Sequence, residues 1–384
     1  MAATFPARLF WLFVGSMMVI GMLMLNISLA SWKNLLSTIH YLPSGLSATS
    51  AIRKMEIEEM PEAERLMAIA RNVQVAGVNC AAVLKGDKNQ TTAALGMTQN
   101  VSIPLSNSFY INLTTDCANF QQQRGYIMSS LTKEEEQFPI AYSLIVYKDA
   151  EMVERLLRAI YRPHNVYCIH VDYKSPLEFF RTISAIANCF PNVFIASKRV
   201  DVTWGTFTVL EPELICMEEL WRYRKWKYFI NLTGQEFPLK TNYELVKILT
   251  VYNGSVDVTT TVKRANPRRW RNTVAPHGLK RVKGSVHIVV NREFVGYILL
   301  NDTAKQLLNW TNKTSIPDET YFAMLNANPQ LGIKGTYKGI PEPSIKRPFI
   351  ARFKNWGDLP CAETFVRNIC ILTTGEYFCN TLGD

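Results

Sequence analysis

Apolar and polar positions alternate in two different periods between residues 138 and 174. Residues 139–147 form a short apolar, β-rich run, and residues 150–161 carry apolar side chains three and four positions apart, which predicts a helix packed by one face. A second β run, residues 165–171, stops at Asp172. Because a crossover of this length normally carries a helix and is right-handed, the two strands are expected to be parallel.

The same alternation of strands and helices continues towards the C-terminus. Helices are predicted at residues 177–187, 210–223 and 242–250, with Asn242 as a cap, and strands at residues 192–196 and 226–232. The predicted fold class is therefore α/β, an α/β/α sandwich with a mostly parallel sheet. Ligands bind beyond the carboxyl ends of the strands in such sheets. Val146, Tyr147, Asp172, Tyr173 and Lys174 occupy those ends, so they are candidate ligand-binding residues.

Beyond residue 251 the pattern becomes looser. Residues 286–290 predict a strand, residues 292–300 and 303–310 predict helices, and residues 349–356 and 365–372 are further strand candidates. Pro317, Asp318 and Glu319 suit the first turn of a helix, where acidic side chains meet the positive end of the helix dipole.

The N-terminal part has a different composition. Residues 9–25 are almost wholly apolar and the low-charge run extends to Trp32, long enough to cross a bilayer as a helix. The alternative is a cleaved signal peptide ending near Ala30. The anchor reading predicts a cytoplasmic tail at 1–8, a signal anchor at 9–32, a luminal stem at 33–115 and a folded domain at 116–384. Within the stem, residues 86–108 are polar and predict a solvated linker.

Glycosylation sequons and cysteines support a luminal location. Seven sequons follow the anchor and predict exposed acceptors, at Asn89, Asn100, Asn112, Asn253, Asn301, Asn309 and Asn312. An eighth sequon, at Asn231, lies in an apolar strand and is expected to be buried. All eight cysteines also follow the anchor, at positions 80, 117, 168, 189, 216, 361, 370 and 379. Disulfides are the favoured interpretation and buried free thiols the alternative, and spacing alone leaves the pairing open.

The net charge of +10 indicates a nucleic acid, a membrane surface or a small anionic ligand as partner. A luminal chain does not meet nucleic acid. The basic residues between Lys263 and Lys283 either border a substrate loop or form a solvated surface. No Asp-x-Asp pair occurs in the chain. If the ligand is a nucleotide sugar, its diphosphate must therefore be bound by Arg, Lys or helix N-termini, and no divalent metal cofactor is expected.

Seven segments in order resemble one enzyme family across residues 115–372. They include AYSLIVYKDAEMVERLLRAIYRPHNVYCIHVDYKS, PNVFIASKRV, WKYFINLTGQEFPLKTNYELV, REFVGYILLND, IPDETYFAML and CAETFVRNICIL. The resemblance is to the core 2 and I-branching β-1,6-N-acetylglucosaminyltransferases, glycosyltransferase family 14. It implies a GT-A-like fold and a type II Golgi membrane protein whose luminal domain is catalytic.

The resemblance also implies roles for individual residues. Val146, Tyr147, Asp172, Tyr173 and Lys174 match segments that hold the uridine nucleotide, with the aromatic Trp204 near the donor. Glu319 matches the catalytic base and Arg367 the arginine that binds the diphosphate. Asp257, Arg269 and Asp358 lie near positions that contact the acceptor. Each has a structural alternative: a helix-dipole carboxylate for Glu319, an exposed strand arginine for Arg367, core packing for Trp204 and a strand-end cap for Asp172.

The resemblance extends to the cysteines, and the C-terminal segment departs from it. The resemblance implies three disulfides, Cys117 with Cys189, Cys168 with Cys216 and Cys361 with Cys370, and leaves Cys80 and Cys379 to pair with each other. The family supplies a further lysine to the diphosphate beyond its last strand. Here the 17 residues after Arg367 contain no Lys or Arg.

The predicted function is metal-independent, inverting transfer of N-acetylglucosamine from UDP-GlcNAc in β-1,6 linkage to an O-glycan, a core 2 type branching reaction. The predicted partners are a UDP-sugar donor, an O-glycan or glycoprotein acceptor and the Golgi membrane, with a homo-oligomer left open. One alternative is a related transferase that uses UDP-xylose or UDP-glucose. The other is a catalytically inactive glycan-binding homologue, and the shortened C-terminus is the feature that favours it.

Overall fold

The structure is a computed structural model that describes residues 79, 82, 87–98, 104–262, 265–271, 273–339, 352–357, 361 and 365–371. The predicted tail and signal anchor, residues 1–32, lie outside these residues. None of the helices within the described part is both long and apolar enough to span a membrane.

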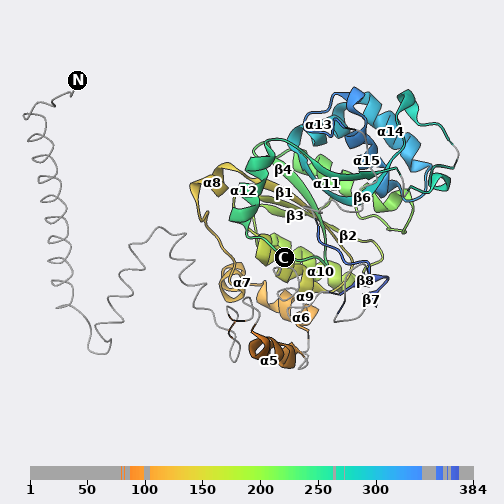
Figure 1. Ribbon diagram of the computed structural model, residues 1–384. Coiled ribbons are helices and arrows are strands. Elements are labelled where there is room, and N and C mark those ends of the chain that lie inside the picture. Colours follow the sequence, from red (N-terminus) through yellow and green to blue (C-terminus); the bar gives the residue numbers. More distant parts are fainter. Residues whose placement is uncertain are drawn as a thin grey trace, which may run out of the picture. The chain divides into compact units, whose positions relative to one another are not determined.

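A six-stranded mixed sheet forms the centre of the domain (Figure 1). Its strands are β1 (Ile140–Val146), β2 (Val166–Val171), β3 (Val193–Ile195), β4 (Tyr228–Thr233), β5 (Asp257–Thr261) and β6 (Lys283–Asn291). The spatial order is β3-β2-β1-β4-β6-β5. The first four strands in that order are parallel, whereas β6 is antiparallel to both β4 and β5. The prediction of an α/β fold with a mostly parallel sheet is confirmed.

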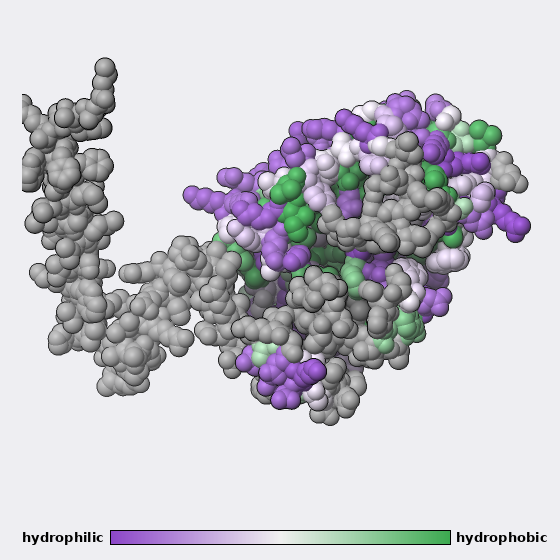
Figure 2. Space-filling view, in the orientation of Figure 1, coloured by the Kyte–Doolittle hydropathy of each residue, from purple (hydrophilic) through white to green (hydrophobic). Residues whose placement is uncertain are grey.

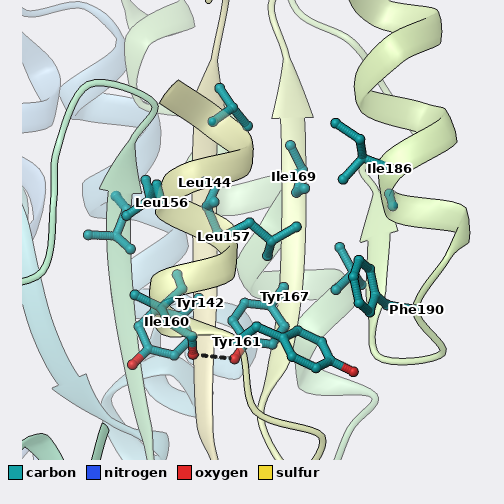
Figure 3. Packing of buried hydrophobic residues seen from close by; sticks show 14 of the residues in the cluster. Tyr142, Leu144, Leu156, Leu157, Ile160, Tyr161, Tyr167, Ile169, Ile186 and Phe190 are labelled. Carbon is teal, nitrogen blue, oxygen red and sulfur yellow. Dashed lines mark hydrogen bonds between the residues drawn. The ribbon is translucent and has the colours of Figure 1, made fainter. Parts of the chain in front are cut away.

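Three helices pack on one face of the sheet, and their apolar periodicity explains why. They are α9 (Ala150–Ile160), α10 (Leu177–Asn188) and α12 (Asn242–Tyr252). Leu156 and Leu157 of α9 are fully buried in one hydrophobic cluster with Leu144 and Ile169 of the strands (Figure 3). Asp149 caps α9 by accepting a hydrogen bond from the Met152 amide.

A second hydrophobic cluster covers the other face. It contains residues of α11 (Glu211–Trp221), α13 (Arg292–Leu300), α14 (Asp302–Asn312) and α15 (Tyr321–Ala327). Side chains of β2, β4 and β6 that point away from the first cluster, among them Cys168, Phe229 and Ile288, belong to this one. The strands are thus buried on both faces, as expected for parallel strands covered by helices.

Short helices precede the sheet. They are α5 (Lys88–Thr98), α6 (Asn107–Leu113), α7 (Cys117–Arg124) and α8 (Lys133–Gln137). Tyr110 of α6 is fully buried in the first cluster. Figure 2 shows mainly hydrophilic side chains on the outer surface around α8, although Glu135 in its middle is buried. Five 3₁₀ turns complete the described elements: η1 (Phe207–Val209), η2 (Pro267–Trp270), η3 (Pro276–Gly278), η4 (Pro317–Glu319) and η5 (Pro329–Leu331).

Several local predictions were wrong. Residues 88–98 of the predicted linker form α5. Thr241, not Asn242, caps α12, because Thr241 and Glu244 form a reciprocal capping box while the Asn242 side chain is buried and donates to Glu135. The strand predicted at 365–372 is a hairpin of β7 (Phe365–Val366) and β8 (Ile369–Cys370). Its chain reverses at Arg367 and Asn368, whose φ angles are 51° and 65°.

The strand predicted at 349–356 is absent from the part of it that the structure describes, residues 352–356. The three implied disulfides are present, Cys117–Cys189, Cys168–Cys216 and Cys361–Cys370. Cys80 and Cys379 lie outside the described residues. Asn231 is 2% exposed, so the prediction that its sequon is buried is confirmed. Asn301 is partly exposed, Asn100 is not described, and the other five predicted acceptors are exposed.

Candidate active site

Residues from both the parallel and the antiparallel parts of the sheet lie together at one end of its strands, called here the sheet edge. The carboxyl ends of β1, β2 and β4 lie at this edge because the three strands are parallel neighbours. Strand β6 runs the other way, so it begins there: Lys283, its first residue, pairs with Thr261, the last residue of β5. The loop between β5 and β6 therefore also lies at this edge.

Glu319 lies at this edge with two cations on one of its oxygens. Arg269 Nη2 is 3.1 Å from Glu319 Oε2, and Lys283 Nζ is 3.4 Å from the same atom. Glu319 Oε1 has no hydrogen bond or ion pair with the residues that the structure describes. The Glu319 side chain is 28% exposed, so a ligand can reach it. One oxygen is thus held by charge while the other is available to a ligand.

Backbone hydrogen bonds fix the segment that carries Glu319. The Ser315 amide donates to the Arg269 carbonyl at 2.8 Å, and the Ile316 amide donates to the Gly205 carbonyl at 2.9 Å. Ile316 adopts a φ of 53°, a conformation that a β-branched residue rarely takes. The expected helix start is thus a 3₁₀ turn, η4, whose strained entry is held from two sides.

Asp318 has a different environment from its neighbour Glu319. Its side chain is 7% exposed, and its Oδ1 has no hydrogen bond in the described part of the chain. Burial, assisted by the nearby Glu319 charge, raises the pKa of Asp318 to about 6. Of the two acids, Glu319 is therefore the one presented to a ligand.

A second carboxylate, Glu236, follows β4 at the same edge. Arg352 Nε donates to Glu236 Oε1 at 2.7 Å, and the Thr233 amide donates to Oε2 at 2.6 Å. Burial alone would raise the pKa of Glu236, but the Arg352 charge, the nearby His287 and the hydrogen bonds from the Thr233 amide and Arg352 together hold this pKa below its ordinary value. Burial lowers the pKa of His287 to about 3, so its 3.6 Å approach to Glu236 is the contact of a neutral ring at neutral pH. The Glu236–Arg352 ion pair holds residues 352–357 at the sheet edge.

Lys354 lies in the same segment as Arg352, so the Glu236–Arg352 ion pair also brings Lys354 to the site. Its Nζ donates to Ser285 Oγ at 3.0 Å, and burial lowers the pKa of Lys354 to about 8. Sequence reasoning missed Glu236 and Lys354 as site residues, and it placed Lys283 only in a basic stretch that either borders a substrate loop or is solvated. For Glu236 a signal existed, because it lies in a turn directly after a predicted strand. For Lys354 the sequence carried no signal.

The five residues predicted at the ends of β1 and β2 are brought together. The Asp172 amide donates to the Val146 carbonyl at 2.9 Å, and the Lys174 amide donates to Asp172 Oδ1 at 2.8 Å. Tyr147 and Tyr173 are 44% and 66% exposed, so their rings are open to a ligand, whereas Val146 offers only its backbone. The Asp172 carboxylate also caps its own loop, as expected from the alternative interpretation of Asp172 as a strand-end cap.

The remaining predicted residues lie in different positions. Trp204 is 80% exposed, which excludes core packing. Arg367 is an exposed residue at the tip of the β7–β8 hairpin. Asp257 begins β5 and pairs with Val289, so it lies towards the opposite edge of the sheet from Glu319. Asp358 lies outside the described residues.

The basic stretch between β5 and β6 divides into two groups. Arg269 and Lys283 turn inward to Glu319. The exposed residues are Arg268, Arg271, Lys280 and Arg281, and Lys263 and Arg264 are not described. The solvated-surface interpretation therefore holds for the exposed residues, whereas the substrate-loop interpretation stays a prediction. The described residues contain no group of three or more His, Cys, Asp or Glu that could hold a metal ion.

Comparison with known proteins gives consistent matches. Residues 140–377 match the Core-2/I-Branching enzyme family. The human "Beta-1,3-galactosyl-O-glycosyl-glycoprotein beta-1,6-N-acetylglucosaminyltransferase 3" is 35% identical over 334 residues, which cover 78% of this chain and 75% of the relative. A second human protein of that name, without the number, is 34% identical over 362 residues, covering 84% and 83%. A bovine herpesvirus 4 protein, also without the number, is 35% identical over 335 residues, covering 78% and 75%.

Proposed function

Because the chain belongs to the core-2/I-branching enzyme family and is a glycosyltransferase of that family, we propose that it transfers N-acetylglucosamine from UDP-GlcNAc to an O-glycan in β-1,6 linkage. The names of its relatives support the donor and the linkage. The observation that carries the proposal is the partly exposed carboxylate of Glu319, whose Oε2 is contacted by Arg269 and Lys283 and whose Oε1 has no hydrogen bond among the described residues.

In the proposed reaction Glu319 acts as the general base. Its Oε1 accepts the proton of the acceptor hydroxyl as that oxygen attacks the anomeric carbon of the donor sugar. The new bond joins the acceptor oxygen to the anomeric carbon, and the bond from that carbon to the β-phosphate oxygen breaks. UDP leaves with the electron pair, and the anomeric configuration inverts. A correctly placed base contributes typically ~10²- to 10⁴-fold to such a step.

The donor is proposed to bind across the ends of β1 and β2. The exposed rings of Tyr147 and Tyr173 and the loop at Asp172 support this placement, because aromatic faces stack on bases and loop amides and carbonyls bind their edges. Arg367 is proposed to bind the diphosphate, and Trp204 to contact the donor. The diphosphate charge is met by side-chain cations in this proposal, and no divalent metal takes part.

The proposed acceptor side is the loop between β5 and β6. Arg269 is buried, yet its Nε and Nη1 have no hydrogen bond among the described residues. Buried guanidinium donors are normally paired, so these two atoms support a polar partner supplied by the acceptor. We further propose that the three disulfides and the exposed sequons belong to a luminal Golgi enzyme.

The test uses the full-length chain in detergent with radiolabelled UDP-GlcNAc and a core 1 disaccharide acceptor, in EDTA. Transfer that persists in EDTA, with a product whose linkage is β-1,6, supports the proposal. A panel with UDP-xylose and UDP-glucose checks the donor, and faster transfer from either would replace N-acetylglucosamine. A folded chain that binds acceptor but turns over none of these donors would instead be an inactive glycan-binding homologue.

A further inference from the structure

Four backbone carbonyls at the carboxyl end of β2 converge on the Arg199 side chain. Arg199 Nε donates to the Val171 carbonyl at 3.2 Å. Its Nη2 lies 2.7 Å from the Asp172 carbonyl and 3.2 Å from the Tyr173 carbonyl. The same nitrogen makes a longer contact, 3.5 Å, with the Ser175 carbonyl. Val171 is the last residue of β2 and the other three lie beyond the strand, where the ladder no longer supplies partners. The Asp172 carbonyl also accepts a hydrogen bond from the Ser175 amide at 3.0 Å.

The Arg199 guanidinium also lies over two aromatic rings. Its Cζ lies 4.4 Å from the ring centroid of Phe180, on α10, and 5.4 Å from that of Tyr173. A planar guanidinium donates in its plane and stacks on its faces, which a lysine ammonium cannot do. The position is therefore built for an arginine.

Other contacts join the same two segments, residues 172–175, called here the nucleotide loop, and residues 199–202. The Tyr173 amide donates to the Val200 carbonyl at 2.9 Å. Lys174 Nζ lies 2.9 Å from Asp201 Oδ1 and also donates to the Val202 carbonyl. Because these ties do not depend on the guanidinium, a change at Arg199 should loosen the nucleotide loop without unfolding the domain.

We infer that Arg199 is a positioning residue for the nucleotide sugar: it holds the nucleotide loop in the conformation that presents Asp172 and Tyr173 to the donor. Its hydrogen bonds to the described residues all end on backbone carbonyls, so in this proposal it acts through the loop. The inference rests on the proposed function for the identity of the donor. It adds a residue whose role lies in donor affinity.

The experiment compares full-length wild type with Arg199→Ala, Arg199→Lys and the control Arg181→Ala, which removes an exposed arginine from α10. Transfer kinetics, UDP binding by calorimetry and amide exchange of peptides spanning 171–176 are measured. Losing several charge-assisted hydrogen bonds should raise the KM for the UDP-sugar and the Kd for UDP by roughly ten-fold or more. The kcat and the acceptor KM should stay within about two-fold, and exchange at 171–176 should become faster.

Arg199→Lys should recover only part of the UDP affinity, because an ammonium cannot reach several carbonyls and stack at once. An unchanged Kd and unchanged exchange in Arg199→Ala would overturn the inference. A fall in kcat at constant KM would overturn it too, since Arg199 would then act on the reacting atoms. Wild type that binds UDP but transfers no sugar would overturn the proposed function, while the UDP Kd values still decide on Arg199. Wild type that fails to bind UDP would overturn both.

Discussion

Lys283 Nζ lies 3.4 Å from Glu319 Oε2, and this pair joins the first residue of a sheet strand to a 3₁₀ turn 36 positions further along the chain. Arg269 reaches the same oxygen from the preceding loop. The carboxylate is therefore oriented by two cations from one side, and its second oxygen is left to the ligand.

Replacing the proposed base is expected to remove transfer. Glu319→Gln keeps the size of the side chain but cannot accept a proton, so kcat should fall by about 100-fold or more. UDP binding and the unfolding midpoint should change little, because the carboxylate is partly exposed. Glu293→Gln, an exposed acid on α13, is the matched control and should retain activity. Near-normal kcat in Glu319→Gln would assign the base to another residue.

Lys283→Met is expected to lower kcat by about ten-fold. The Lys283 ammonium holds Glu319 Oε2 together with Arg269, so its loss should leave the carboxylate less well oriented toward the acceptor hydroxyl. Lys283→Arg should restore most of the rate, and Lys280→Met, an exposed lysine of the same loop, should leave it unchanged. A wild-type kcat in Lys283→Met would show that this ion pair does not orient the base.

Glu213→Gln is expected to stabilise the domain above neutral pH. The Glu213 carboxyl is buried below the sheet, where it accepts hydrogen bonds from Ser143 and Asn231, and burial raises its pKa from the ordinary 4.5 to about 7. The folded state then binds the proton more tightly than the unfolded state. Stability is therefore lost as pH rises from about 4.5 to about 7, by a few kcal/mol in total.

The uncharged glutamine makes no such pH-dependent contribution to stability. Denaturant unfolding at pH 5 and pH 8 should show a smaller difference for Glu213→Gln than for wild type. Equal differences in the two proteins would mean that Glu213 is ionised and compensated in the fold.

Gly284→Ala is expected to destabilise the domain. A Cβ at Gly284 would lie 2.3 Å from the Thr259 carbonyl oxygen and 2.6 Å from the Ala323 Cβ, so β5 or α15 would have to move. Such overpacking costs about 1–3 kcal/mol, measurable as a lower unfolding midpoint. Gly96→Ala in α5, where a Cβ meets nothing within 4 Å, should be neutral or slightly stabilising. A Gly284→Ala protein as stable as wild type would contradict the close approach.

The parallel part of the fold could be predicted from local patterns because each element there carries its own signal. Strand β1 and helix α9 were placed to within a residue or two, since a buried strand reads as a continuous apolar run and a covering helix as a stripe. Strand β5, with the sequence Asp-Val-Thr-Thr-Thr, gave no apolar run, because it is an edge strand with one buried residue, Val258. The hairpin at Arg367 was missed because its turn depends on positive φ angles at two residues, and the apolar residues on either side read as one continuous strand.

The candidate site was only partly predictable for a related reason. Asp172 and Tyr173 could be found because they follow a parallel strand directly, and topology places all such ends together. Glu319 was predicted only through family resemblance, since its sequence context reads equally well as a helix start. Lys283 and Lys354 reach the site through the reversed direction of β6 and the Glu236–Arg352 ion pair, and neither relationship is local in sequence.

The reversal of β6 has a consequence for how this enzyme can diversify. Residues 257–291, from the start of β5 to the end of β6, form one contiguous stretch of chain that carries Arg269 and Lys283. The segments proposed to hold the uridine lie more than 50 residues earlier, on β1, β2 and the connection after β3, and Arg367, proposed for the diphosphate, lies after it. Insertions and deletions among the exposed residues of this one stretch are therefore expected to alter the proposed acceptor side and to leave the proposed donor side unchanged. Arg269 and Lys283 would have to be kept, because both contact Glu319.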